Sequence, residues 1–124
     1  MVYLRHRRAE LLGLDRSVGS DLRLTTVEEM RGLGRTLPGH RHMLSSLSIK
    51  MATRISLLPP GGVLVVRNFR FPILEQTLHL LYAGRIHLEY VDSQDVLDLL
   101  CTWNCPDILC SPLGGPLGGP GRSS

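Results

Sequence analysis

Two histidines and three cysteines are the side chains with which this sequence could hold a metal ion. His40 and His42 stand two apart, and Cys101, Cys105 and Cys110 follow far downstream. A structural zinc site needs about four nitrogen or sulfur ligands, normally from closely spaced pairs. No Cys-x-x-Cys is present, so we interpret the cysteines as small buried or half-buried thiols. We expect no metal ion and no other cofactor.

Catalytic signatures are also missing from the sequence. Ser, His and Asp all occur, but no Gly-x-Ser-x-Gly nucleophile elbow holds a serine in a reactive turn. Gly32-Leu33-Gly34 lacks the third glycine and the Lys-Ser/Thr pair of a phosphate-binding loop. We therefore expect a protein that is not an enzyme and has no catalytic residues.

The composition indicates one folded domain. The chain has 124 residues, and 43% of them are apolar, which is enough to build a core. No stretch approaches the ~18 consecutive apolar residues of a membrane span, and no secretory signal is visible. Three cysteines without a paired framework fit a reducing compartment. These features predict a cytoplasmic or nuclear location.

Positive charge is concentrated near the N-terminus. The net charge is +3, and Arg5, Arg7 and Arg8 form the densest basic cluster. We interpret residues 1–9 as a flexible basic N-terminus. The alternative function is a small basic nucleic-acid-binding domain that uses these arginines and Arg16. Interleaved aromatic residues for base stacking are absent, so this alternative ranks second.

Hydrophobic periodicity predicts a succession of short elements before residue 70. Helical spacing of apolar residues favours helices, and strict alternation favours strands. The expected elements are a helix at residues 9–14, strands at 21–25 and 35–37, a helix at 40–49 and a buried strand at 63–66. Thr25 and Thr26 also suit the cap of a helical turn, because Glu28 and Glu29 follow three residues later. The sequence leaves strand and cap open as alternatives.

The clearest predicted element is the helix Phe71–Ala83. Its apolar side chains fall within one wide arc at 100° per residue, and they are Phe71, Ile73, Leu74, Leu78, Leu80, Leu81 and Tyr82. So broad an arc predicts a helix that packs on several partners and forms the core. Gly84 supplies its C-terminal stop.

The last third of the chain predicts a strand, a helix and a tail. Residues 85–89 alternate as a short strand, and Asp92 or Ser93 can cap a helix that ends near Cys105, before Pro106. Residues 106–109 could open one more helical turn. Residues 111–124 are rich in glycine and proline, so we expect a disordered tail that folding does not need.

Five stretches in this order resemble the BTB/POZ domain family. Ser20-Asp21-Leu22-Arg23-Leu24 resembles the family's first strand, which opens Ser/Cys-Asp-Val. His40-Arg41-His42-Met43-Leu44-Ser45-Ser46-Leu47-Ser48 is similar to its signature His-Arg/Lys-x-x-Leu-Ala/Ser-Ala/Ser-x-Ser. The other three are Val65-Val66-Arg67-Asn68-Phe69, like the third strand and its turn; residues 71–84, like the helix ending Ile/Leu-Tyr-Thr-Gly; and residues 96–103 with 106–109, like the closing helical pair.

The resemblance covers about residues 10–110 and implies an interaction module. Its fold would be α/β (α+β), a small sheet packed on helical hairpins, used to dimerise or to bind partner proteins. The resemblance puts the N-terminal helix at the dimer contact, so Leu11, Leu12 and Leu14 are the expected dimer residues. In the family's transcriptional members the matching Asp and Arg lie together in a charged pocket used by partners. Asp21 and Arg41 are therefore the expected partner-binding residues.

The sequence also departs from the family pattern. Members that bind cullin scaffolds often carry an apolar-x-Glu motif after the signature helix, but no acid lies between Glu29 and Glu75. Met51 stands where the family often has Phe. The resemblance thus implies a truncated or divergent member, with ubiquitin-ligase adaptor and transcriptional co-regulator as its possible roles.

Overall fold

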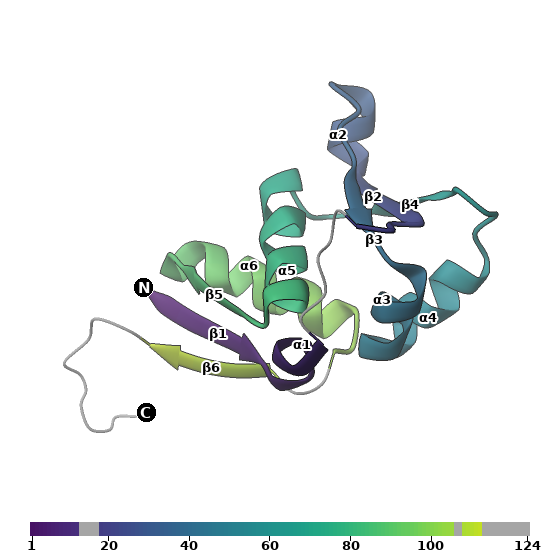
Figure 1. The fold of residues 1–124 in the computed structure, drawn as a ribbon. Coiled ribbons are helices and arrows are strands. Elements are labelled where there is room, and N and C mark those ends of the chain that lie inside the picture. Colours follow the sequence, from purple (N-terminus) through teal and green to yellow (C-terminus); the bar gives the residue numbers. More distant parts are fainter. Residues whose placement is uncertain (13–17, 106–107, 113–124) are drawn as a thin grey trace.

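The structure, a computed structural model, describes residues 1–12, 18–105 and 108–112. Helices and short strands alternate along the chain except where α4 directly follows α3, and Figure 1 shows their arrangement. In chain order they are β1 (Val2–His6), α1 (Arg7–Leu12), β2 (Leu22–Thr26), α2 (Val27–Arg31), β3 (Leu37–Gly39), α3 (Arg41–Leu47), α4 (Ile49–Ser56), β4 (Val63–Val66), α5 (Phe71–Ala83), β5 (Arg85–Leu88), α6 (Tyr90–Thr102) and β6 (Ile108–Pro112).

One three-stranded sheet joins both ends of the described chain. Its order is β5-β1-β6, and both pairings are antiparallel. The structure differs here from the expected flexible N-terminus at residues 1–9. Val2 and Leu4 alternate with Tyr3 and Arg5, and this period-2 pattern buries both apolar side chains in the core.

The second sheet lies in the other half of the molecule (Figure 1). Its order is β3-β2-β4, with β3 antiparallel and β4 parallel to β2. The sequence left a strand and a helix cap open as alternatives at Thr25 and Thr26, and the structure contains both, one after the other. Thr26 is the last residue of the strand, and its Oγ1 accepts a hydrogen bond from the Glu29 N–H at 3.2 Å, which caps α2.

Strand β3 begins later than expected, at Leu37 instead of Arg35. The Arg35 guanidinium and N–H bind the buried Glu29 carboxylate, with the guanidinium Nε 2.9 Å from Oε2. Arg35 also lies over the Phe71 ring, with Cζ 4.7 Å from the ring centroid. These contacts hold Arg35 in the α2–β3 turn, so strand pairing starts beyond it.

The helix expected at residues 40–49 is divided into α3 and α4. Ser48 interrupts it with an extended backbone, φ −144° and ψ 122°. Its hydroxyl accepts a hydrogen bond from the Met51 N–H at 3.1 Å and donates one to the Trp103 carbonyl. Ser48 is therefore an N-cap that starts α4 and ties it to the end of α6.

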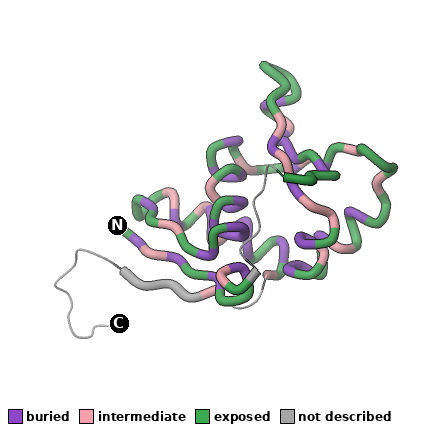
Figure 2. Tube along the Cα trace, in the orientation of Figure 1, coloured by how far each residue is buried: buried purple, intermediate pink, exposed green. Residues whose placement is uncertain are grey.

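Helix α5 forms the core, as predicted, and its bounds match the prediction. All seven residues of its predicted apolar arc are buried, with Leu74, Leu78, Leu80 and Leu81 at 0% exposure. Figure 2 shows the buried positions concentrated on this helix. Gly84 ends the helix with φ 88°.

The C-terminal part departs from prediction in three places. Helix α6 starts at Tyr90, before Asp92 or Ser93, and Cys101 is exposed although Cys105 is half-buried. A strand, β6, occupies Ile108–Pro112, so the expected turn at 106–109 and the start of the expected tail at 111 are wrong there. The main-chain N–H and C=O groups of this segment pair with β1 in an antiparallel ladder instead. Residues 106, 107 and 113–124 lie outside the described residues.

The described residues contain neither a membrane-spanning helix nor a metal-binding cluster. Within residues 1–12, 18–105 and 108–112, no helix is long and apolar enough to cross a membrane. The same ranges hold no group of three or more His, Cys, Asp or Glu side chains placed to bind a metal ion.

Candidate partner-binding site

Asp21 and Arg41 are brought together, as the resemblance predicts, but by a different contact. Asp21 directly precedes β2, where its N–H donates to the Gly39 carbonyl at 3.1 Å. Arg41 is the first residue of α3. The Asp21 carboxylate accepts a hydrogen bond from the Arg41 main-chain N–H at 2.8 Å. Asp21 therefore stabilises the N-terminus of α3, where a negative charge is favourable.

The Arg41 guanidinium points elsewhere. It donates to the carbonyl oxygens of Ile55 at 2.9 Å, Leu58 at 3.3 Å and Pro59 at 3.4 Å. These carbonyls lie at and beyond the end of α4, where those of Ile55 and Pro59 also accept main-chain hydrogen bonds from Leu58 at 3.0 Å and Gly62 at 2.9 Å. The ion pairs between described residues do not include Asp21 with Arg41. The predicted carboxylate–guanidinium pair is thus replaced by two helix-end contacts.

A pocket of about 230 Å³ lies beside Asp21. It is lined by Ser20, Asp21, Leu22, Arg23 and Gly61. Asp21 and Arg23 are two positions apart and both exposed, so they stand on the same side of the extended segment. The pocket is therefore lined by one negative and one positive side chain, and the Arg23 guanidinium donates a hydrogen bond to Thr36 Oγ1 at 3.3 Å.

His40 and Tyr82 form a contact that our sequence analysis missed. The Tyr82 hydroxyl accepts a hydrogen bond from the His40 main-chain N–H at 2.7 Å and lies 3.0 Å from His40 Nδ1. His40 Nε2 lies 2.6 Å from the Val18 carbonyl, which can only accept. His40 Nε2 therefore donates to this carbonyl. His40 opens the signature stretch and Tyr82 lies near the end of the helix stretch, but no sequence signal pairs them.

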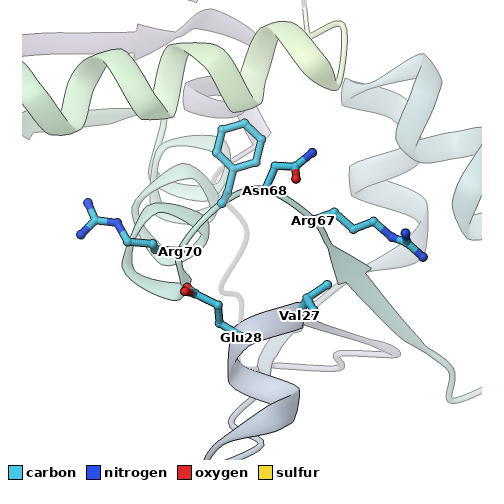
Figure 3. Close-up of a pocket in the computed structure, with 6 residues that line it drawn as sticks. Val27, Glu28, Arg67, Asn68 and Arg70 are labelled. Atoms are coloured by element: carbon cyan, nitrogen blue, oxygen red, sulfur yellow. The ribbon is translucent and has the colours of Figure 1, made fainter.

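A larger pocket, of about 480 Å³, lies between the start of α2 and the turn after β4. Val27, Glu28, Arg67, Asn68, Phe69 and Arg70 line it. Figure 3 shows the Arg67 and Arg70 side chains extending away from one another. Two diverging cations do not make a site for a single anion, so this pocket carries no assigned chemistry.

The predicted dimer residues are described only in part. Leu11 lies in α1 and is 87% exposed. Helix α1 is held in place at two points. Arg8 donates to the Ser46 carbonyl at 3.1 Å, and Glu10 passes so close to Gly84 that an added Cβ would lie 2.7 Å from its main chain. The Leu12 side chain and all of Leu14 lie outside the described residues.

Solved structures of BTB domains have this fold. The BTB domain of zebrafish PATZ1 matches with a TM-score of 0.59 and 16% sequence identity, over 81% of this chain and 80% of that chain. The BTB (Tramtrack and Bric a brac) domain of human gigaxonin matches with a TM-score of 0.61 and 18% identity, over 80% and 79%. No protein-family model matches the chain, and no curated protein is significantly similar to it. The likeness confirms the predicted α+β fold class.

Proposed function

We propose that this chain with a BTB-type fold is a non-catalytic protein–protein interaction module that forms a homo- or heterodimer. The observation that carries the proposal is the fold, which spans about four-fifths of the chain at TM-scores of 0.59 and 0.61. Function has to be argued from sites and not from the fold alone. The exposed leucine of α1 and the charged segment at Asp21 are the two sites that support it.

Leu11 is the proposed centre of the dimer contact. A leucine that is 87% exposed leaves most of its apolar surface in water. The two anchors of α1, at Ser46 and Gly84, fix its position before any partner binds. A two-fold axis next to α1 would bring the same surface of a second copy against it, and each copy would cover the other's leucine. Leu12 and Leu14 belong to the same proposed contact.

Light scattering after size-exclusion chromatography tests the dimer contact. We expect Leu11→Glu to convert a dimer to a monomer, because a buried contact would then hold two unpaired carboxylates. Leu33→Glu is the matched control, since Leu33 is 83% exposed on the α2–β3 turn, away from α1 (Figure 1). A dimer mass unchanged in Leu11→Glu contradicts the contact. Deleting residues 1–14 is unsuitable, because it removes β1 and the buried Leu4.

Partner binding is proposed at the Asp21 segment. Asp21, Arg23 and the pocket beside them offer both charges on an exposed surface, which suits a polar partner segment. Arg41 takes part indirectly, because its main-chain N–H holds the Asp21 carboxylate. We rank a cytoplasmic or nuclear transcriptional co-regulator above a cullin adaptor. Cullin-binding members of the family often carry an apolar-x-Glu motif after the signature helix, and this sequence has no acid between Glu29 and Glu75.

The nucleic-acid alternative loses two of its arginines to contacts within the fold. Arg5 binds the Glu10 carboxylate, with Nη2 2.9 Å from Oε1, and Arg8 binds the Ser46 carbonyl. Arg7 remains exposed, and Arg16 lies outside the described residues. Phosphate contacts need several free cations on one surface, so we rank the interaction module first.

A further inference from the structure

Strand β5 is an edge strand with unpaired backbone groups. His6 N–H donates to the Gly84 carbonyl at 2.8 Å, and Arg5 lies opposite Arg85 in the next pair. Hydrogen-bonded and non-hydrogen-bonded pairs alternate in an antiparallel ladder. The N–H and C=O groups of Arg85 and His87 therefore point away from β1. Both residues are exposed, and no described residue pairs with these outward groups.

The same strand carries uncompensated positive charge. Arg85 lies directly opposite Arg5, a like-charge pair that is unfavourable across two strands. Glu10 neutralises one of them through a two-point contact with Arg5, at 2.9 and 3.2 Å. Among described residues Arg85 has no ion pair. The second arginine at this position therefore has no carboxylate in direct contact among the described residues.

Arg7 adds a third cation to this cluster. The hydrogen bond from Arg5 lowers the pKa of the Glu10 carboxyl, and the charges of Arg85 and Arg7 lower it further, against the effect of burial. Arg5 contacts this carboxylate, and Arg85 and Arg7 act on it through their charges, so three arginines share one acid. Like charges placed close together are unfavourable for folding, and such features are expected mainly at functional surfaces.

We propose that β5 is a docking edge for an acidic, extended segment of a partner protein, which adds to the sheet as a fourth strand. Main-chain hydrogen bonds from Arg85 and His87 would hold the segment, in the manner of other strand additions to sheet edges. An acidic side chain of the segment would lie against Arg85. Glu89 follows the strand, so acids are favoured at the Arg85 end and not at the other.

Charge complementarity selects this occupant over two others. A second copy of the chain would bring a second cluster of the same arginines to the interface, and the like charges would repel. A nucleic acid would meet a compact cluster with little room for bases, because the Tyr3 ring is stacked on His87 with centroids 4.6 Å apart. The edge groups also satisfy a peptide backbone, which a nucleic acid lacks. The main-chain groups of the edge belong to β5 and Leu11 belongs to α1, so the inference does not depend on a dimer.

Fluorescence anisotropy with two labelled peptides tests the docking edge on the full chain. The probes are an alternating Glu-Val peptide and the matching Lys-Val peptide. We expect the acidic peptide alone to bind. Arg85→Glu should weaken its binding at least about tenfold, a loss typical of a reversed interface charge. Arg67→Glu is the control, since Arg67 is also exposed but lies in the turn after β4, and it should bind like wild type.

A proline substitution tests the backbone contacts separately. His87→Pro removes the outward N–H and is compatible with an edge strand. His87→Ala is its matched control, because both variants lose the Tyr3 stack but alanine keeps the N–H. We expect His87→Pro to bind the acidic peptide at least about tenfold more weakly than His87→Ala. Proline removes the His87 N–H that would bind the added strand, and the neighbouring main-chain hydrogen bonds to that strand are weakened with it. Melting temperatures confirm that each variant is folded.

Four results would overturn the inference. The wild-type chain could fail to bind the acidic peptide, Arg85→Glu could bind it as wild type does, or the His87 variants could bind it equally. Oligothymidylate that binds through Arg85 and is indifferent to His87→Pro would identify a nucleic-acid surface instead, which also overturns it. A monomeric mass in light scattering would contradict the dimer proposal and leave this inference intact.

Discussion

Replacing Asp21 and Arg41 separately and together measures how the two residues stabilise the fold. A carboxylate–guanidinium pair would couple them, because each side chain would lose its partner when the other is removed. In the structure the Asp21 carboxylate binds the Arg41 main-chain N–H instead. Replacing the Arg41 side chain leaves that N–H in place. We therefore expect the two substitutions to act independently.

The magnitudes follow from the contacts that each substitution removes. Asp21→Ala removes a carboxylate from the N-terminus of α3, which costs about 1 kcal/mol, as for other lost helix caps. Asp21→Asn keeps an acceptor oxygen and should cost less. Arg41→Gln leaves the carbonyls of Ile55, Leu58 and Pro59 without their shared donor. The loss is about 1.5–3 kcal/mol for hydrogen bonds to a charged group, toward the lower end where water reaches the carbonyls.

Urea unfolding of the wild type, both single variants and the double variant gives the coupling energy. We expect Asp21→Ala and Arg41→Gln to add within about 0.5 kcal/mol, as independent sites do. A coupling energy above about 1 kcal/mol would show that the two side chains interact directly and would refute the helix-end account. Circular dichroism and fluorescence melts should coincide, which supports two-state analysis.

The remaining predictions concern the core, one glycine and acid stability. Leu78→Ala should lower the free energy of unfolding by about 2–5 kcal/mol in urea melts, because its side chain is fully buried. Gly84→Ala should lower the free energy of unfolding by at least about 1–3 kcal/mol, because the position has φ 88° and an added Cβ would lie 2.3 Å from Glu10 Cγ. Gly61→Ala is the control, since Gly61 also has a positive φ but lies in open space, and it should lower the free energy of unfolding less. The hydrogen bond from Arg35 lowers the pKa of the Glu29 carboxyl in the folded protein. The ionised carboxyl therefore stabilises the fold above its unfolded pKa of about 4.3, and this stability is lost as pH falls through the lowered folded pKa. Urea midpoints between pH 7 and pH 2 should therefore fall less in Glu29→Gln than in wild type.

Local signals in the sequence were sufficient for the central helix and several strands. The apolar arc of Phe71–Ala83 is broad enough to specify helix, burial and bounds together, and Gly84 marks its end. The run at Val63–Val66 likewise predicted a strand, but only Leu64 and Val66 are buried, while Val63 is exposed and Val65 half-buried. These elements were predictable because their own side chains carry the pattern.

Elements that depend on distant partners were not predictable in the same way. β1 and β6 are adjacent only because the two ends of the described residues meet, and their ladder pairs residues that are far apart in the sequence. Arg5, read as part of a flexible basic segment, is held by Glu10.

The candidate site shows the same limit. Family resemblance placed Asp21 near Arg41, but it did not reveal that the Arg41 main-chain N–H makes the contact. Side-chain direction depends on where α4 ends, since the Arg41 guanidinium binds carbonyls there. The contact between His40 and Tyr82 joins residues 42 positions apart. Sequence reasoning named both residues and had no means to pair them.

Sedimentation velocity of the full chain with a labelled single-stranded oligonucleotide tests the central claim most directly. The account predicts a protein dimer whose mass is the same at low and high salt, while the oligonucleotide sediments as the free molecule. A monomeric protein that carries the oligonucleotide at low salt and releases it at high salt would contradict the account, because phosphate binding has that salt dependence and a dimerising interaction module does not require it.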